Sequence, residues 1–255
     1  MIDPAPAATP SPSESSNGKK GPTCKVFRSG NAAISQESFG EISEILTQPD
    51  VLVWFDLVDP DANDLQVLKS EFDLHPLAIE DAVMAHERPK IEQYGDYWFL
   101  VLRPATQQEN GNAVFHEMAV FAGEKFLITV RHQPEYPLKE LEERWNAHPK
   151  QLRQGGGFLL YTILDTVVDG YFPVVSDLED QIEQLEEELF QRESYSTAVL
   201  RTIFAFKRQG QRLRHAIMPM RDILNPIIRG DITLFPEDLL AYYRDVYDHS
   251  VRAID

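Results

Sequence analysis

The pattern of hydrophobic and polar positions divides the chain into a mixed part and a part that is almost continuously helical. From Cys24 to about Arg131, short runs rich in β-branched and aromatic residues are bounded by Gly, Asn or Pro, at 51–58, 96–103, 114–122 and 126–131. Such runs are typical of β-strands. The Gly123-Glu124-Lys125 junction between the last two runs predicts a tight hairpin.

Helical segments are expected between these strands. Asp59 followed by Pro60 is typical of a helix cap and first turn, and Leu65, Leu68 and Phe72 then recur at helical spacing. A second short helix is predicted to begin at Pro76. The pattern therefore predicts an α/β domain over residues 24–150.

After about residue 136 the chain reads as helix, broken at Gly155–Gly157 and kinked at Pro173. Two heptad-like runs follow, an acidic one and a basic one, with apolar positions at Val175, Leu178, Ile182, Leu185 and Leu189, and from Val199 to Leu224. Their charges are typical of solvated faces, and the opposite signs also favour one register. We expect an antiparallel helical hairpin within residues 151–230.

The two ends of the chain differ in character. Residues 1–23 are rich in Pro, Ser and Ala, contain no apolar signal-peptide core, and predict a disordered tail. Pro236 opens a last helix that reaches Asp255 without a capping residue. We therefore expect residues 231–255 to be the start of a truncated helix that continues in a longer protein.

Composition adds a strong acidic balance. A formal net charge of −17 repels phosphate backbones, so a nucleic-acid partner is not expected, whereas cations are attracted. The same charge also fits a merely soluble acidic protein. One cysteine, Cys24, excludes an intrachain disulfide and a thiolate-rich zinc site. There is no uncharged apolar run of about 18 residues, so the chain as given is expected to be soluble.

Several carboxylates are spaced as metal ligands could be. Asp165 and Asp169 lie one turn apart in an otherwise apolar helix, as do Asp245 and His249 in the last helix. Glu80 and Asp81 are adjacent on a short helix. Like charges one turn apart are explained either by solvent exposure or by a hard cation such as Mg²⁺, and spacing alone does not decide between them.

Enzyme motifs are missing from the sequence. It has no phosphate-binding loop, no G-x-G-x-x-G, no H-E-x-x-H and no G-x-S-x-G, so we do not expect an enzyme. The triple glycine reads as a plain loop. Two alternatives from other classes stay open at this point: an acidic coiled-coil adaptor, and a metal-dependent hydrolase that uses His75 with Glu80 and Asp81.

Several blocks in sequence order resemble one known family. Residues 55–102 resemble the amino-terminal domain of CorA-type magnesium transporters, in which a W-[IV]-D-L type strand is followed by motifs like those at 75–81 (HPLAIED) and 86–92 (HERPKIE) and by an aromatic strand. Residues 159–189 and 218–225 (MPMRDILN) resemble the helical arm of that family, and 242–250 (YYRDVYDHS) resembles the start of its stalk helix.

The resemblance implies an α/β/α sandwich followed by long coiled-coil-like helices and the start of a stalk. It implies a homopentameric Mg²⁺ channel of the cell inner membrane, with this part on the cytoplasmic side and membrane helices beyond Asp255. Relatives of the same architecture carry Co²⁺, Ni²⁺ or Zn²⁺, so a zinc transporter is an open alternative.

The resemblance also implies regulatory residues. Asp81 of one subunit and Asp245 of its neighbour match the pair that holds a regulatory ion, and Glu80, Asp165, Asp169 and His249 match accessory positions. In that pattern, Mg²⁺ between subunits favours the closed channel.

Overall fold

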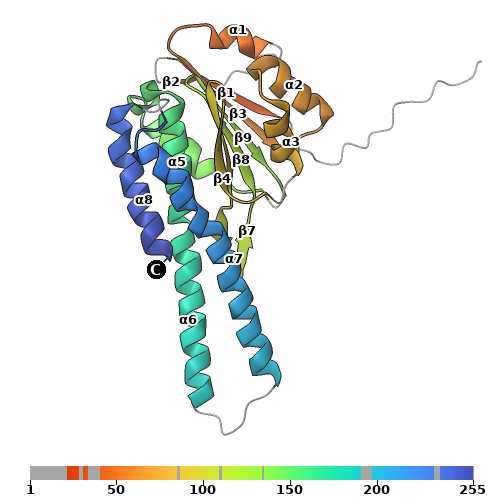
Figure 1. The fold of residues 1–255 in the computed structure, drawn as a ribbon, viewed down its shortest axis with the longest axis vertical. Helices are drawn as coiled ribbons and strands as arrows, with labels where there is room; N and C mark the ends of the chain where they lie inside the picture. The colour runs from red at the N-terminus through yellow and green to blue at the C-terminus, as the bar shows by residue number, and fades with distance from the viewer. Residues whose placement is uncertain are drawn as a thin grey trace, which may run out of the picture.

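A computed structural model gives the fold of residues 22–28, 31–33, 41–84, 87–108, 111–133, 135–190, 197–232 and 236–254. The tail predicted over residues 1–23 lies outside these ranges, apart from residues 22 and 23. The described chain forms a sheet with helices on both faces and a pair of long helices that project beyond it (Figure 1).

The central sheet contains seven strands in the order β2-β1-β3-β9-β8-β5-β4. β3 and β9 are parallel, and the other neighbouring pairs are antiparallel. The predicted hairpin at Gly123 is confirmed, since its N–H donates to the Phe126 carbonyl at 2.9 Å between β8 and β9. The strands are β1 (Thr23–Arg28), β2 (Asn31–Ala33), β3 (Val51–Val58), β4 (Lys90–Tyr94), β5 (Tyr97–Leu102), β8 (Met118–Ala122) and β9 (Phe126–Arg131), with β6 (Ala105–Gln107) and β7 (Ala113–Phe115) as a separate ribbon.

Helices cover both faces of the sheet, which confirms the expected α/β/α sandwich. Successive side chains of a strand point to opposite faces, so Val53 and Phe55 of β3 join one core while Leu52 and Trp54 join the other. The first core lies under α1 (Ile42–Leu46), α2 (Ala62–Phe72) and α3 (Pro76–Met84). The second lies under α4 (Lys139–Ala147), α5 (Gly156–Asp169), α6 (Tyr171–Phe190), α7 (Thr197–Ile228) and α8 (Leu240–Ile254), with the 3-10 turns Gln151–Gln154 and Glu237–Leu239.

The cap of α2 differs from the prediction. Asp61, not Asp59, caps the helix, because its side chain accepts bonds from the N–H groups of Asn63 and Asp64. The Asp64 side chain in turn accepts from the N–H of Asp61, which completes a capping box. Asp59 instead has a positive φ of 46° at the end of β3.

The triple glycine is more than a plain loop. Only Gly155 lies outside α5, which begins at Gly156. The N–H of Gly156 donates to the Glu124 carbonyl at 3.0 Å, and a Cβ on Gly156 would lie 2.1 Å from the Gly123 carbonyl oxygen. The glycine therefore lets the helix start directly on the β8–β9 turn, which aligns α5 against the sheet.

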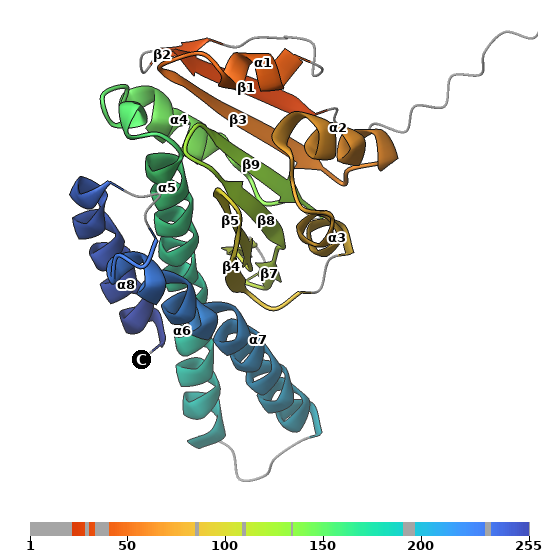
Figure 2. The same ribbon diagram turned by 45° about the horizontal axis from the view of Figure 1, so that its top comes forward.

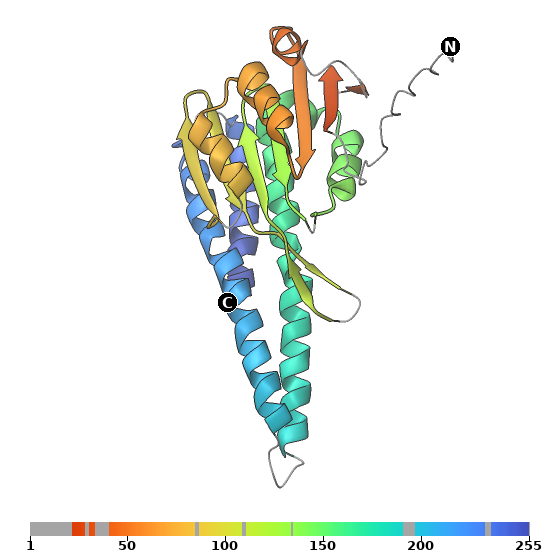
Figure 3. The same ribbon diagram turned by 90° about the vertical axis from the view of Figure 1, so that its right-hand side faces the viewer.

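α6 and α7 run antiparallel and form the projecting arm (Figure 3). A kink was predicted at Pro173, and the helix break lies close to it, at Gly170 between α5 and α6. Pro173 has no N–H to donate to the Asp169 carbonyl, so one helical hydrogen bond is missing at this point. Along the predicted seam, Leu178 is 8% exposed, whereas Ile182 is 37% and Ile203 is 41% exposed. The seam is therefore unevenly packed, since Leu178 near the sheet and Val199 near the start of α7 are buried whereas Ile182 and Ile203 are exposed.

One helical stretch in the described chain, Gly156–Phe190, is long and apolar enough to cross a membrane, with a mean hydropathy of 1.4 in its most apolar window. Of that window, 67% is buried inside the fold. The stretch corresponds to α5 and α6, whose apolar side belongs to the core under the sheet.

Candidate metal centre

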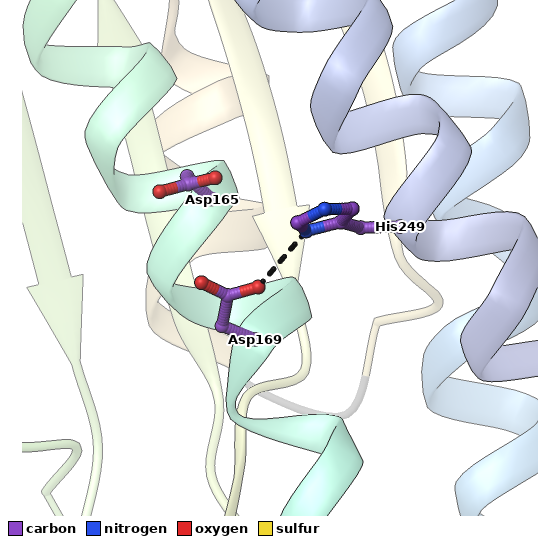
Figure 4. Close-up of side chains that lie close together, drawn as sticks. All are labelled: Asp165, Asp169 and His249. Carbon is purple, nitrogen blue, oxygen red and sulfur yellow. Dashed lines mark hydrogen bonds and ion pairs between the residues drawn. The ribbon is translucent and has the colours of Figure 1, made fainter.

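Two helices bring three candidate ligands together. Asp165 and Asp169 lie one turn apart on α5, and His249 reaches them from α8, with one ligand atom of each within 4.8 Å of the others (Figure 4). α8 is held against α5 by Tyr243, whose buried hydroxyl donates to the Gly157 carbonyl at 2.7 Å. Packing of the two helices thus creates a cluster that neither helix carries alone.

Both ring nitrogens of His249 face carboxylates. Nδ1 lies 3.1 Å from Asp169 Oδ1, and Nε2 lies 3.8 Å from Asp245 Oδ2, one turn back on α8. The Asp169 side chain is 53% exposed and that of Asp245 is 66% exposed. The cluster is therefore open to solvent on this side, and Asp245 extends it to four residues.

Asp165 forms the buried end of the cluster. Arg144 of α4 donates from Nη2 to Asp165 Oδ2 at 2.6 Å, and from Nη1 to Thr166 Oγ1 at 2.9 Å. Burial raises the pKa of Asp165, the charge of Asp169 adds to this, and Arg144 opposes it. Burial is the largest single influence on the Arg144 guanidinium and lowers its pKa, but the hydrogen bond and charge of Asp165, together with Tyr161 and the charge of Asp169, give a net rise in the pKa of Arg144.

The donor set fits a divalent cation. Mg²⁺ takes oxygen ligands at about 2.0–2.1 Å and keeps several waters, so directly bound atoms lie at most about 4.2 Å apart. The 4.8 Å limit of the cluster is slightly wider, which small side-chain rotations or a bridging water can span. An imidazole nitrogen also suits Co²⁺, Ni²⁺ and Zn²⁺.

The other two predicted ligands lie in another layer. Glu80 and Asp81 are on α3, which packs on the opposite face of the sheet from α8 (Figure 2). Glu80 is exposed, and Asp81 Oδ2 lies 2.8 Å from Lys90 Nζ. Within one chain, therefore, the fold brings Asp165, Asp169, Asp245 and His249 together and leaves Glu80 and Asp81 apart from them.

His75 is engaged in capping and stacking. Its Nδ1 accepts from the Leu77 N–H at 3.2 Å, and its ring stacks on Tyr94 with centroids 5.0 Å apart. Among the residues that the structure describes, His75 does not join Glu80 and Asp81 in a group of three candidate metal ligands. The described geometry thus offers no support for the hydrolase alternative.

Arg144 is a neighbour of the candidate site that the sequence did not single out. A buried carboxylate needs a partner, so Asp165 in an apolar helix was a signal that one of the basic residues lies against it. The sequence contains 24 Lys and Arg residues, and only the packing of α4 on α5 selects Arg144.

Fold and cluster together define an acidic α/β domain with a candidate divalent-cation site between two helices. Residues 49–255 match the family described as "CorA-like Mg2+ transporter protein". The chain belongs to this family.

Individual relatives agree with this assignment. The chain is 34% identical to YfjQ of Bacillus subtilis over 211 residues, which are 82% of this chain and 64% of that protein. It is 31% identical to the "Cobalt/magnesium transport protein CorA" of Thermotoga maritima over 186 residues, 72% of this chain and 52% of that protein. The chain thus spans less than two thirds of either relative.

A solved structure shares the fold. The soluble domain of CorA from Methanocaldococcus jannaschii matches with a TM-score of 0.69 and 19% identity, over 91% of this chain and 89% of that domain. At this identity the match supports the architecture and carries no residue roles.

Proposed function

We propose that the chain is the cytoplasmic metal-sensing and gating domain of a CorA-like divalent-cation transporter, in which Mg²⁺ bound between neighbouring copies favours the closed state. The observation that carries the proposal is the cluster of Asp165, Asp169, Asp245 and His249 between α5 and α8. The family membership of residues 49–255 supports it.

The placement of Asp81 supports a site between copies. Asp81 lies on α3 and Asp245 on α8, on opposite faces of the sheet, so a second copy is needed to bring the two carboxylates together. A contact between two different faces is heterologous, and such contacts close into rings when the rotation allows it. We therefore propose a cyclic homo-oligomer, with five copies as the family resemblance implies, anchored in the inner membrane by helices that follow residue 255.

The switch would follow from electrostatics. Asp81 and Asp245, with Glu80 nearby, would repel one another across the interface, and Lys90, 2.8 Å from Asp81, offsets only part of this negative charge. A divalent cation between the carboxylates would offset the rest. An ion that binds better in the closed arrangement shifts the population toward it by its differential affinity. A sensor that releases and rebinds Mg²⁺ needs only millimolar affinity, about 4 kcal/mol at a dissociation constant of 1 mM.

The test uses the full-length protein with Asp81→Asn and Asp245→Asn, singly and together. We expect Mg²⁺ to protect the wild type from protease, and the double variant to lose this protection and to keep transporting when Mg²⁺ is high. Wild-type protection of the double variant would show that these residues do not hold the ion. Lost protection with normal closure would place the switch elsewhere.

The same assay separates the candidate ions. Mg²⁺, Co²⁺, Ni²⁺ and Zn²⁺ are compared at equal free concentration for protection and for uptake. Protection by Zn²⁺ alone would favour the zinc-transporter alternative. No uptake of any of these ions by the full-length protein would favour the acidic adaptor.

A further inference from the structure

Asp165 has a cationic partner within the chain itself. The Arg144 guanidinium donates to Asp165 Oδ2 at 2.6 Å, and the Asp165 side chain is only 10% exposed. Both oxygens of a carboxylate share one negative charge, so an ion bound at Asp165 meets a positive charge within the same site. Arg144 is therefore placed to compete with a metal ion for Asp165, and as a cation it cannot itself be a metal ligand.

The charges of the cluster match one divalent ion when Arg144 is included. Asp165, Asp169 and Asp245 contribute three negative charges, and Arg144 contributes one positive charge. One divalent cation would neutralise this group. Without Arg144 the same ligands would attract a divalent ion more strongly and release it less readily.

We propose that Arg144 is a tethered counterion that competes with the metal for Asp165 and thereby lowers the affinity of the site. This inference rests on the proposed metal-sensing function. In the empty site the guanidinium balances the buried carboxylate, so the α5–α8 surface stays folded when the ion leaves. A site built this way binds Mg²⁺ weakly enough to follow changes in its concentration.

A purely structural role for Arg144 makes a different prediction. Nη1 of Arg144 also donates a hydrogen bond to Thr166 Oγ1, which connects α4 to α5. Thr166 is uncharged, so this bond anchors Arg144 without affecting the charge of the site. Thr166→Val removes that bond and leaves the ion pair with Asp165 in place. It is therefore the matched control for loss of anchoring, and Arg144→Lys is the control that keeps the charge.

The experiment measures Mg²⁺-dependent thermal unfolding of this chain, with folding of each variant checked by circular dichroism. We expect Arg144→Gln to bind Mg²⁺ about three- to tenfold more tightly than the wild type, seen as a larger rise in Tm at a given Mg²⁺ concentration. Arg144→Lys and Thr166→Val should stay within about twofold of the wild type. Asp169→Asn should abolish the response.

A second measurement needs no variant of Arg144. In the ¹⁵N-labelled wild type, the assigned guanidinium resonance of Arg144 should shift as Mg²⁺ is added, with the same midpoint as the rise in Tm. This keeps the proposal testable even where Arg144→Gln does not fold.

The outcomes separate the two proposals. Unchanged or weaker Mg²⁺ binding by Arg144→Gln, or a guanidinium signal indifferent to Mg²⁺, would overturn the role of Arg144 alone. A wild type whose Tm does not depend on Mg²⁺ through Asp169 would overturn the metal site within one chain, and with it the role of Arg144. The ion proposed between Asp81 and Asp245 of neighbouring copies is tested separately, by the variants of the full-length protein.

Discussion

Replacing Asp56 by Asn should be among the most destabilising single changes in the sheet. Asp56 on β3 is 6% exposed, and Arg131 on β9 is 7% exposed. Arg131 Nε donates to Asp56 Oδ1 at 2.9 Å, and Nη2 bonds Oδ2. Asn is close in shape to Asp, so the packing around residue 56 stays the same. The change removes only the buried negative charge, and the Arg131 guanidinium loses its anionic partner at this position.

Breaking a buried ion pair from one side costs about 3–5 kcal/mol. Arg131 keeps two other partners, since Nη1 donates to the Tyr136 carbonyl at 2.6 Å and to Glu135 Oε2 at 3.3 Å. Asn can also keep the bond that Thr129 Oγ1 donates to Asp56 Oδ1 at 2.6 Å. We therefore expect a loss near the lower end, about 3 kcal/mol, out of the roughly 5–15 kcal/mol typical of a domain.

Urea unfolding at constant m-value measures this loss. The double variant Asp56→Leu, Arg131→Met should recover much of it, because no buried charge is left unpaired. Lys139→Gln is the matched control: its pair with Glu143, at 3.6 Å, is exposed at both ends, so no measurable change is expected. A loss below about 1 kcal/mol for Asp56→Asn, or a double variant that is no more stable than the single one, would refute the reasoning.

Three further predictions concern the arm, the start of α5 and assembly. Leu178 at the base of the arm is 8% exposed, so Leu178→Ala should lower the free energy of unfolding by about 2–5 kcal/mol. Leu185 is half-buried, so Leu185→Ala should lower it clearly less. Equal losses in urea unfolding would mean that Leu185 is as closely packed as Leu178. Gly156→Ala should cost about 1–3 kcal/mol, because its Cβ would lie 2.1 Å from the Gly123 carbonyl oxygen; an unchanged Tm would contradict that contact. Without membrane helices the chain should be monomeric or weakly associated in light scattering at micromolar concentration, and a tight dimer that forms without metal would count against the proposed transporter.

Local patterns were enough to predict the main strands and the class of fold. The run at 51–58 is apolar at nearly every position, as a strand buried on both faces requires, and it forms β3. β1 was missed because its Lys25 and Arg28 interrupt the apolar pattern, although every residue of β1 pairs with β3, over Val51–Asp56. The cap of α2 was misplaced by two residues, since Asp59 and Asp61 both flank Pro60 and only backbone geometry decides which side chain reaches the free N–H groups.

The sequence was enough to predict which ligands of the candidate site lie in pairs on one helix, but not the net charge of the site. Spacing of four residues puts Asp165 beside Asp169 and Asp245 beside His249, since that is a property of any helix. Their meeting depends on the packing of α8 on α5, and the Arg144 contact depends on α4, more than twenty residues before Asp165. Ligands one turn apart are thus encoded locally, whereas the counterion that balances them is set by tertiary structure. Counting the carboxylates alone makes the site too negative, because the fold places the Arg144 guanidinium 2.6 Å from its most buried carboxylate.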